Sequence, residues 1–422
     1  MSDKTSLVLL FMAGDETTAF QIDPLLEEIQ CGLKNIPLAS DRPDVYCLYL
    51  RRSTTGQQFK ITDTPEIKPN GFGGLTNFPP PGSVPLTGSL SSQLTTFLQH
   101  VGLNLTASGP VHFIIGAHGV PVSGFHPVLF FRLVFAFLRS FFSFELRGLT
   151  WRARFWRLRD RIFLIGQPLG AIASGSKLPD LTLDDTALAL KKLPCLRLNS
   201  VILHTCNLSG IETMSALRAA KFHIACESEL ANWMRFRKWF LTLASPTATP
   251  ELITKACMDS MELVPSDTLG CFSSHRVDCE TLLNKLNALG NQLTSLLKST
   301  DSTIAAATKE AIRIAKVKSG VSNYTVDVVV FCRNLGESTN LPIGSRQAAN
   351  AVADEIANEV QLRLIMTDSW KTSNKFKFYG GISMYLPLRN DPYYPTEHLP
   401  ESFRTGAPDW IEFLKIWDGT TT

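Results

Sequence analysis

The sequence lacks the features that mark several classes of protein. Its net charge is only +3, because 41 lysine and arginine residues oppose 38 aspartate and glutamate residues. This near balance gives no overall signature of polyanion binding. Charged residues make up only 19% of the 422 residues and hydrophobic residues 44%, so disorder is excluded as the overall state. No internal repeat and no long low-complexity tract is present.

Cysteine is present, but its arrangement suits neither a metal site nor a disulfide framework. The nine cysteines are odd in number and irregularly spaced, without a CxxC pair or a Cys/His cluster of zinc-binding spacing. We therefore expect no metal, and free thiols in a reducing compartment. The apolar stretch at residues 7–13 is too short for a signal peptide and no cleavage-like site follows it. These features predict a cytoplasmic protein.

Short apolar runs alternate with amphipathic stretches through the first half of the chain. This alternation predicts an α/β fold with a mainly parallel sheet flanked by helices. The expected strands are 7–13, 45–50, 111–116, 200–205 and 222–226, and the expected helices are 22–36, 89–103, 181–192 and 210–220.

The second half of the chain is expected to be more helical. One packed helix face is predicted by leucines that recur every three or four residues, namely Leu282, Leu286, Leu289, Leu293 and Leu296. Further helices are expected at 304–318 and 348–364, and strands at 324–332 and 376–386. The predicted domains are a catalytic core at 1–260 and a C-terminal helical region at 261–422, whose late strands can return to the core sheet.

Two chemically reactive residues follow predicted strands of the core. His118 comes after the strand at 111–116, and Cys206 comes after the strand at 200–205. In an open parallel sheet, reactive groups gather beyond the carboxyl ends of the strands. If the two strands are neighbours, a thiol nucleophile and an imidazole meet in one crevice, which is the arrangement of a cysteine hydrolase.

The backbone beside His118 and Cys206 suits the same chemistry. Gly119 has no side chain, so its N–H can approach a carbonyl oxygen and form an oxyanion hole together with the N–H of Cys206. Cys206 also precedes a predicted helix, whose positive end would favour a thiolate. A lone His or Cys at a strand end is usually structural, so spacing alone leaves the catalytic and the structural interpretations equally open.

Local sequence resembles one peptidase family at several points along the chain. The segments FMAGD at 11–15, IGAHG at 115–119, TCNLSGIE at 205–212, ACESE at 225–229 and GGISMYLP at 380–387 resemble, in order, motifs of clostripain-like cysteine peptidases. The resemblance implies a caspase-like fold, hydrolysis of protein or peptide substrates, and His118 and Cys206 as the catalytic dyad. It implies no cofactor. It also implies an enzyme that can be held latent by a loop until that loop is cut.

One position departs from the family pattern. Clostripain-like enzymes usually carry Asp two residues before the nucleophile, in the pocket for a substrate Arg or Lys, and His204 occupies this position here. An imidazole does not stabilise a buried guanidinium. Three interpretations stay open: His204 favours a neutral or acidic residue, Glu227 or Glu229 supplies the missing carboxylate, or His204 is a core residue without a substrate role.

An inserted segment at 127–165 is the second departure. Residues 128–146 are rich in phenylalanine, and a basic, aromatic stretch follows up to residue 161. A single membrane crossing here would separate two strands that must pair, so a hairpin on the membrane surface, a flap over the protein or a partner-binding helix is expected instead. Nucleic-acid binding is not expected, because no known module surrounds the arginines. The alternative function is therefore a catalytically weak, caspase-like interaction protein that docks on a membrane or partner through 128–161.

Overall fold

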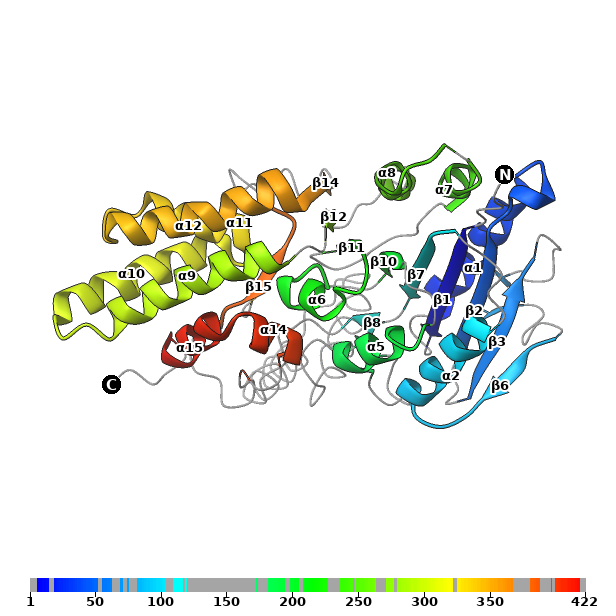
Figure 1. The fold of residues 1–422 in the computed structure, drawn as a ribbon, viewed down its shortest axis with the longest axis horizontal. Coiled ribbons are helices and arrows are strands. Elements are labelled where there is room, and N and C mark those ends of the chain that lie inside the picture. Colours follow the sequence, from blue (N-terminus) through cyan, green and yellow to red (C-terminus); the bar gives the residue numbers. More distant parts are fainter. Residues whose placement is uncertain are drawn as a thin grey trace, which may run out of the picture.

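The structure is a computed structural model of the chain. It describes residues 6–14, 19–51, 55–62, 69–70, 74–75, 82–103, 109–116, 118–119, 172–173, 181–193, 198–204, 208–226, 236–245, 247–262, 271–276, 279–321, 325–366, 380–387, 396 and 399–417. A large sheet with helices on both faces lies beside a group of C-terminal helices (Figure 1). Residues 127–165 lie outside the described residues.

Nine of the described strands form one sheet, in the order β14-β12-β11-β10-β7-β1-β2-β3-β6. The five central strands, from β11 to β2, are parallel, and antiparallel strands extend the sheet on both sides. The strands of this sheet are β1 Leu7–Gly14, β2 Asp44–Arg51, β3 Gly56–Ile61, β6 Val84–Leu86, β7 Val111–Gly116, β10 Leu198–His204, β11 Phe222–Cys226, β12 Cys271–Arg276 and β14 Gln361–Met366. Short two-stranded ladders are formed by β4 Pro69–Asn70 with β5 Gly74–Leu75, by β8 His118–Gly119 with β9 Ile172–Ala173, and by β13 Thr325–Asp327 with β15 Ser383–Tyr385.

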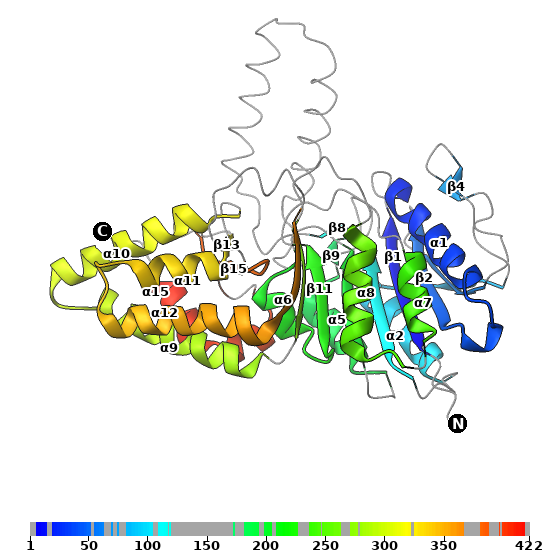
Figure 2. The ribbon, with the colours of Figure 1, turned by 90° about the horizontal axis from the view of Figure 1, so that it is seen from above.

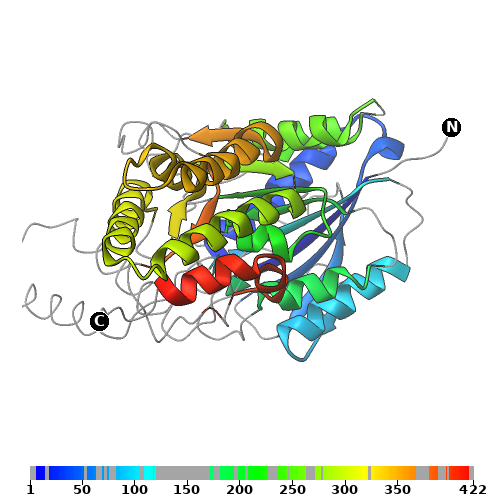
Figure 3. The same cartoon turned by 60° about the vertical axis from the view of Figure 1, so that its left-hand side comes forward.

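Helices cover both faces of the central strands, which explains why those strands are apolar throughout. One face carries α1 Ala19–Lys34, α7 Phe236–Leu243 and α8 Pro250–Glu262, and the other carries α2 Leu90–Leu103 and α5 Leu183–Leu190. Figure 3 shows the strands between these two helix layers. The mainly parallel arrangement predicted from the alternating pattern holds for these central strands.

The C-terminal helices have a hydrophobic core of their own. We call this group the C-terminal layer; it consists of α9 Glu280–Leu297, α10 Ser302–Ser319, α11 Val328–Glu337, α12 Ile343–Glu355, α14 Glu401–Gly406 and α15 Pro408–Trp417. The predicted leucine face of α9 is confirmed, since Leu282, Leu286, Leu289 and Leu293 are buried and Leu296 packs against them. A short helix, α6 Ile211–Ala216, lies between this layer and the sheet (Figure 2).

Two predicted elements of the second half were wrong. The strand predicted at 324–332 ends at Asp327, and helix α11 follows. Its buried residues Val328, Phe331, Cys332 and Leu335 recur with helical spacing, and this periodicity outweighs the β-branched composition. The Asp327 carboxylate begins the helix by accepting a hydrogen bond from the Val330 N–H.

The helix predicted at 348–364 was also too long. α12 ends at Glu355, a π-helical turn covers Ile356–Val360, and the chain then enters strand β14. β14 pairs with β12 at the edge of the large sheet, so tertiary pairing outweighs local helix preference here. A 3-10 turn at Ala39–Asp41 precedes β2.

Candidate active site

Strands β7 and β10, which precede the two reactive residues, are neighbours in the sheet. They are parallel, and their last paired residues are Gly116 and His204. His118 and Cys206 each follow one member of this pair by two residues. The adjacency that the sequence argument required is therefore confirmed for the strands. Cys206 itself lies outside the described residues.

The backbone of His118 and Gly119 forms a short ladder next to the sheet. In strand β8, His118 is paired with Ala173 and Gly119 with Ile172 in antiparallel fashion. The segment 128–161, for which membrane or partner contact was considered, falls between β8 and β9 along the chain and outside the described residues. The backbone at the candidate catalytic histidine is thus tied to the residues that follow the insertion.

The helix after Cys206 begins close to its predicted start at residue 210. Gly210 is the N-cap of α6, which starts at Ile211, so Cys206 precedes the cap by four residues along the chain. The expectation that this helix favours a Cys206 thiolate stays a prediction. Glu227 and Glu229, proposed as alternative carboxylates, lie outside the described residues.

His204 is the last residue of β10 and is 7% exposed. Neighbouring residues of a strand point to opposite faces, so His204 shares a face with Ile202, which packs in the core under α1, α7 and α8. Its partner Gly116 approaches Met12 on that face, because a Cβ at residue 116 would lie 2.5 Å from the Met12 sulfur. His204 is therefore mostly buried at the carboxyl edge of the sheet.

The segment that follows Cys206 is fixed by strand β15. The Ser209 hydroxyl donates to the Gly381 carbonyl at 2.6 Å, and the Ser383 N–H donates to the Ser209 carbonyl at 2.8 Å. The Tyr385 N–H donates to Oε1 of Glu212 at 2.7 Å. These three bonds lock residues 209–212 alongside β15.

Glu212 is a buried acid at this junction. Glu212 is 1% exposed. Burial raises the pKa of its carboxyl to about 7, although the hydrogen bond from the Tyr385 N–H lowers it. The sequence argument assigned no role to this residue. A signal was present, because Glu212 is a charged residue between Ile211 and Met214, which both pack in the core of the C-terminal layer.

A second buried acid, Asp327, holds the other end of β15. Its Oδ2 accepts hydrogen bonds from the N–H groups of Gly380 and Gly381, at 2.9 and 3.0 Å. Burial raises the pKa of this carboxyl to about 7, while the hydrogen bonds from Val330 and the two glycines lower it. The sequence argument missed Asp327 too, although an acid inside an apolar run such as 326–331 is itself a signal.

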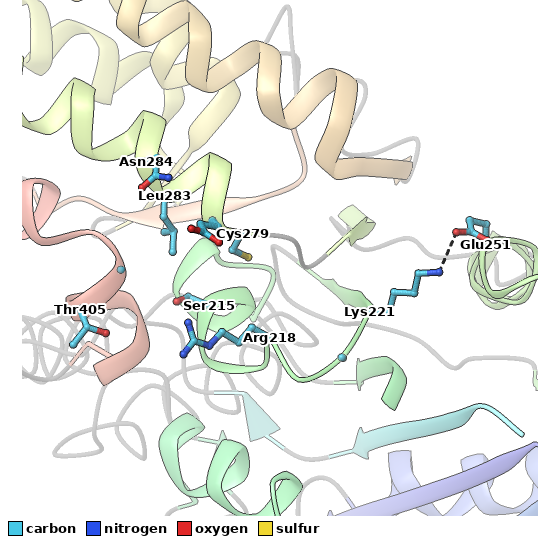
Figure 4. A pocket seen from close by; sticks show the side chains of 11 residues that line it. Ser215, Arg218, Lys221, Glu251, Cys279, Leu283, Asn284 and Thr405 are labelled. Carbon is cyan, nitrogen blue, oxygen red and sulfur yellow. Dashed lines mark ion pairs between the residues drawn. The ribbon is translucent and has the colours of Figure 1, made fainter. Parts of the chain in front are cut away.

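A cavity of about 990 Å³ lies between α6, α8, α9 and α14 (Figure 4). The Lys221 N–H bonds to the carbonyl of Leu198, the first residue of β10, so this cavity is at the amino edge of the parallel strands. An ion pair of 3.5 Å between Lys221 and Glu251 lies at one side of it (Figure 4). His204 does not line this cavity, because it lies at the opposite, carboxyl end of β10.

Within the described part of the chain, no group of three or more His, Cys, Asp or Glu side chains could hold a metal ion. Six cysteines whose side chains the structure describes are not in disulfides: Cys31, Cys47, Cys226, Cys257, Cys279 and Cys332. None of the described helices is both long and apolar enough to cross a bilayer.

The sheet order, the flanking helices and the C-terminal layer define the fold of the C11, or clostripain-like, cysteine proteases. The caspase-like fold that the resemblance implied is therefore confirmed. No family model and no curated protein matches the sequence, so the relation is visible in the fold alone.

Three solved structures illustrate this likeness. The inactive zymogen of a C11 protease from Parabacteroides distasonis is 14% identical, with a TM-score of 0.55 over 96% of this chain and 99% of that chain. The secreted C11 protease iotapain from Bacteroides thetaiotaomicron is 11% identical, with a TM-score of 0.57 over 98% of this chain and 100% of that chain. A C11 protease of the latter organism in complex with an irreversible peptide inhibitor is 12% identical, with a TM-score of 0.54 over 96% and 99% of the two chains.

Proposed function

We propose that this protein is a cysteine peptidase that hydrolyses peptide bonds with Cys206 as the nucleophile and His118 as its acid–base partner. The register of β7 and β10 carries this proposal. Gly116 is paired with His204, and His118 and Cys206 stand equally far beyond that pair. Paired parallel strands run about 4.8 Å apart. The two segments that follow β7 and β10 therefore start side by side at the carboxyl edge of the sheet.

The proposed reaction follows from the chemistry of these groups. The Cys206 sulfur attacks the scissile carbonyl carbon and forms a C–S bond, while the carbonyl oxygen becomes an oxyanion. The backbone N–H groups of Gly119 and Cys206 stabilise that oxyanion. His118 takes the proton of the Cys206 thiol and delivers it to the leaving amine as the C–N bond breaks. It then takes a proton from the water that attacks the thioester, and returns that proton to the Cys206 sulfur as the C–S bond breaks. This reaction needs no organic cofactor.

The substrate is proposed to be a protein or peptide. One structural neighbour was solved with an irreversible peptide inhibitor, which supports peptide binding in this fold. His204 is assigned to the pocket for the side chain before the scissile bond, with Glu227 and Glu229 as its alternatives. A mostly buried imidazole there disfavours a substrate Arg or Lys.

The enzyme is further proposed to be latent until it is cut within the insertion. Another neighbour is an inactive zymogen, which supports latency in this fold. The pairing of His118 with Ala173 supports it as well, because a cut between β8 and β9 would release the backbone on one side of the proposed histidine.

A peptide-library assay tests the dyad, on protein with and without limited trypsin treatment followed by a serine-protease inhibitor. Cys206→Ala and His118→Ala should each lower kcat by at least about a hundredfold, since each removes a group that reacts in the transition state. Two matched controls should retain activity. Cys226→Ala changes a buried thiol at the end of a different strand, β11, and His100→Ala changes an exposed histidine on α2. Hydrolysis that persists in folded Cys206→Ala protein would refute the assignment.

A further inference from the structure

The C-terminal layer reaches the proposed nucleophile through one buried side chain. We propose that Glu212 is a positioning residue: its carboxyl group fixes β15 against the segment that carries Cys206, and so sets the orientation of the thiol. This inference rests on the proposed peptidase function. It assigns to the C-terminal layer a part in the active site rather than that of a separate accessory region.

The first support is the position of the hydrogen bonds between β15 and the residues that follow Cys206. Ser209 is bonded to Ser383 of β15 and to Gly381 just before this strand, and Gly210 forms a parallel bridge with Ser383. The bond from the Tyr385 N–H to Glu212 continues this ladder by one more step, with a side chain as the acceptor. Because α6 begins at Ile211, the helix backbone cannot offer an extended strand edge at this step. The Glu212 carboxyl therefore replaces the backbone acceptor that the ladder lacks.

The second support is the space around Glu212. A Cβ at Gly210 would lie 3.0 Å from Oε2 of Glu212 and 3.7 Å from the Ser383 hydroxyl oxygen. The carboxyl is thus enclosed between the N-cap of α6 and β15, with little room to rotate away. A loss of this group would free both the end of β15 and the start of α6, the helix that directly follows the Cys206 segment.

The third support is that the far end of β15 is fixed as well. Asp327 binds the N–H groups of Gly380 and Gly381, and Gly381 holds φ at 64°, a left-handed conformation that favours glycine. The Gly381 carbonyl in turn accepts the Ser209 hydroxyl. Two buried acids therefore hold the same strand at both ends against the Cys206 segment.

Three variants of Glu212 and two variants of an unrelated acid test the inference. Glu212→Gln keeps an oxygen acceptor for the Tyr385 N–H, Glu212→Asp retracts the acceptor by one methylene, and Glu212→Ala removes it. The matched control is Glu355→Ala. Glu355 is also a nearly buried acid of the C-terminal layer, and it pairs with Lys285 of α9 at 2.6 Å. Glu355→Gln provides its milder counterpart. The assay measures kcat and KM for a peptide that the wild type cleaves, at a temperature below the melting temperature of every variant.

We expect Glu212→Ala and Glu212→Asp to lower kcat by at least about tenfold with KM changed less than about threefold, because small displacements of a reacting group cost up to about a hundredfold. Glu212→Gln should recover kcat to within about threefold of the wild type. Glu355→Ala should lower the melting temperature with kcat unchanged.

Three results overturn the inference, and they distinguish a failure of the positioning role from a failure of the proposed function. Wild-type protein that shows Cys206-dependent hydrolysis, together with Glu212→Asp and Glu212→Ala variants of unchanged kcat, would refute the positioning role alone. A loss of kcat in Glu355→Ala equal to that in Glu212→Ala would do the same, since the effect would then reflect general destabilisation. Wild-type protein without any Cys206-dependent hydrolysis would refute the proposed function, and the positioning role with it.

Discussion

Replacing His112 and Ser200 together should make the free energy of unfolding less dependent on pH below neutrality. These residues face each other on β7 and β10, the two strands that lead to His118 and Cys206. Nδ1 of His112 and the Ser200 hydroxyl share a hydrogen bond of 2.7 Å. The ring also meets Trp239 edge-on, with centroids 5.4 Å apart. Within the described residues, Nε2 of His112 is buried and has no hydrogen-bond partner, so a second ring proton would be unsatisfied there.

The magnitude follows from proton linkage. Burial lowers the pKa of His112 from 6.5 to about 3, so the unfolded chain binds a proton below pH 6.5 that the folded chain does not. The stability contributed by the neutral ring is fully present above pH 6.5 and is lost as the pH falls toward 3. At pH 5.5, one unit below the unfolded pKa, the loss is about 1.4 kcal/mol. This value depends little on the folded pKa, provided that it lies well below 5.5.

The variant pair is His112→Phe with Ser200→Ala. Phenylalanine keeps a ring against Trp239, and alanine removes the hydroxyl that would otherwise lose its partner. The single His112→Phe variant leaves that hydroxyl unsatisfied and should cost about 1–3 kcal/mol at every pH. The free energy of unfolding is measured by urea denaturation at pH 7.5 and pH 5.5. The wild type should lose about 1.4 kcal/mol more than the double variant between these pH values; equal losses would refute the linkage argument.

Two further substitutions test the packing of the C-terminal layer and the role of His204. Gly290→Ala should destabilise the protein by about 1–3 kcal/mol, because the new Cβ would lie 2.8 Å from the Trp410 backbone where α9 crosses α15. The matched control is Gly344→Ala, whose Cβ would meet only Gln292 at 3.6 Å. Equal melting temperatures of the two variants in thermal denaturation would contradict the close approach at Gly290. His204→Asp should raise kcat/KM for peptides with Arg or Lys before the scissile bond by about tenfold relative to wild type, through charge complementarity, and an unchanged library profile would show that residue 204 does not face the substrate.

The sequence by itself determined the elements whose periodicity is local. The apolar runs at β1, β7 and β10 and the leucine face of α9 were predicted from residues near one another in the chain, because burial on both faces or on one helical stripe leaves a local pattern. The family resemblance led to the caspase-like fold by the same local motifs. His118 and Cys206 were singled out because each follows such a strand.

Only the tertiary structure decided which strands are neighbours. The parallel pairing of β7 with β10, in the register that relates His118 to Cys206, joins residues about 88 positions apart, as in the pair His112 and Ser200. The hydrogen bond between Glu212 and Tyr385 spans 173 residues. Contacts of such separation leave no periodic trace, since either partner taken alone is an ordinary acid or backbone N–H. The same reason explains β14, which became a strand because β12 offered an edge to pair with.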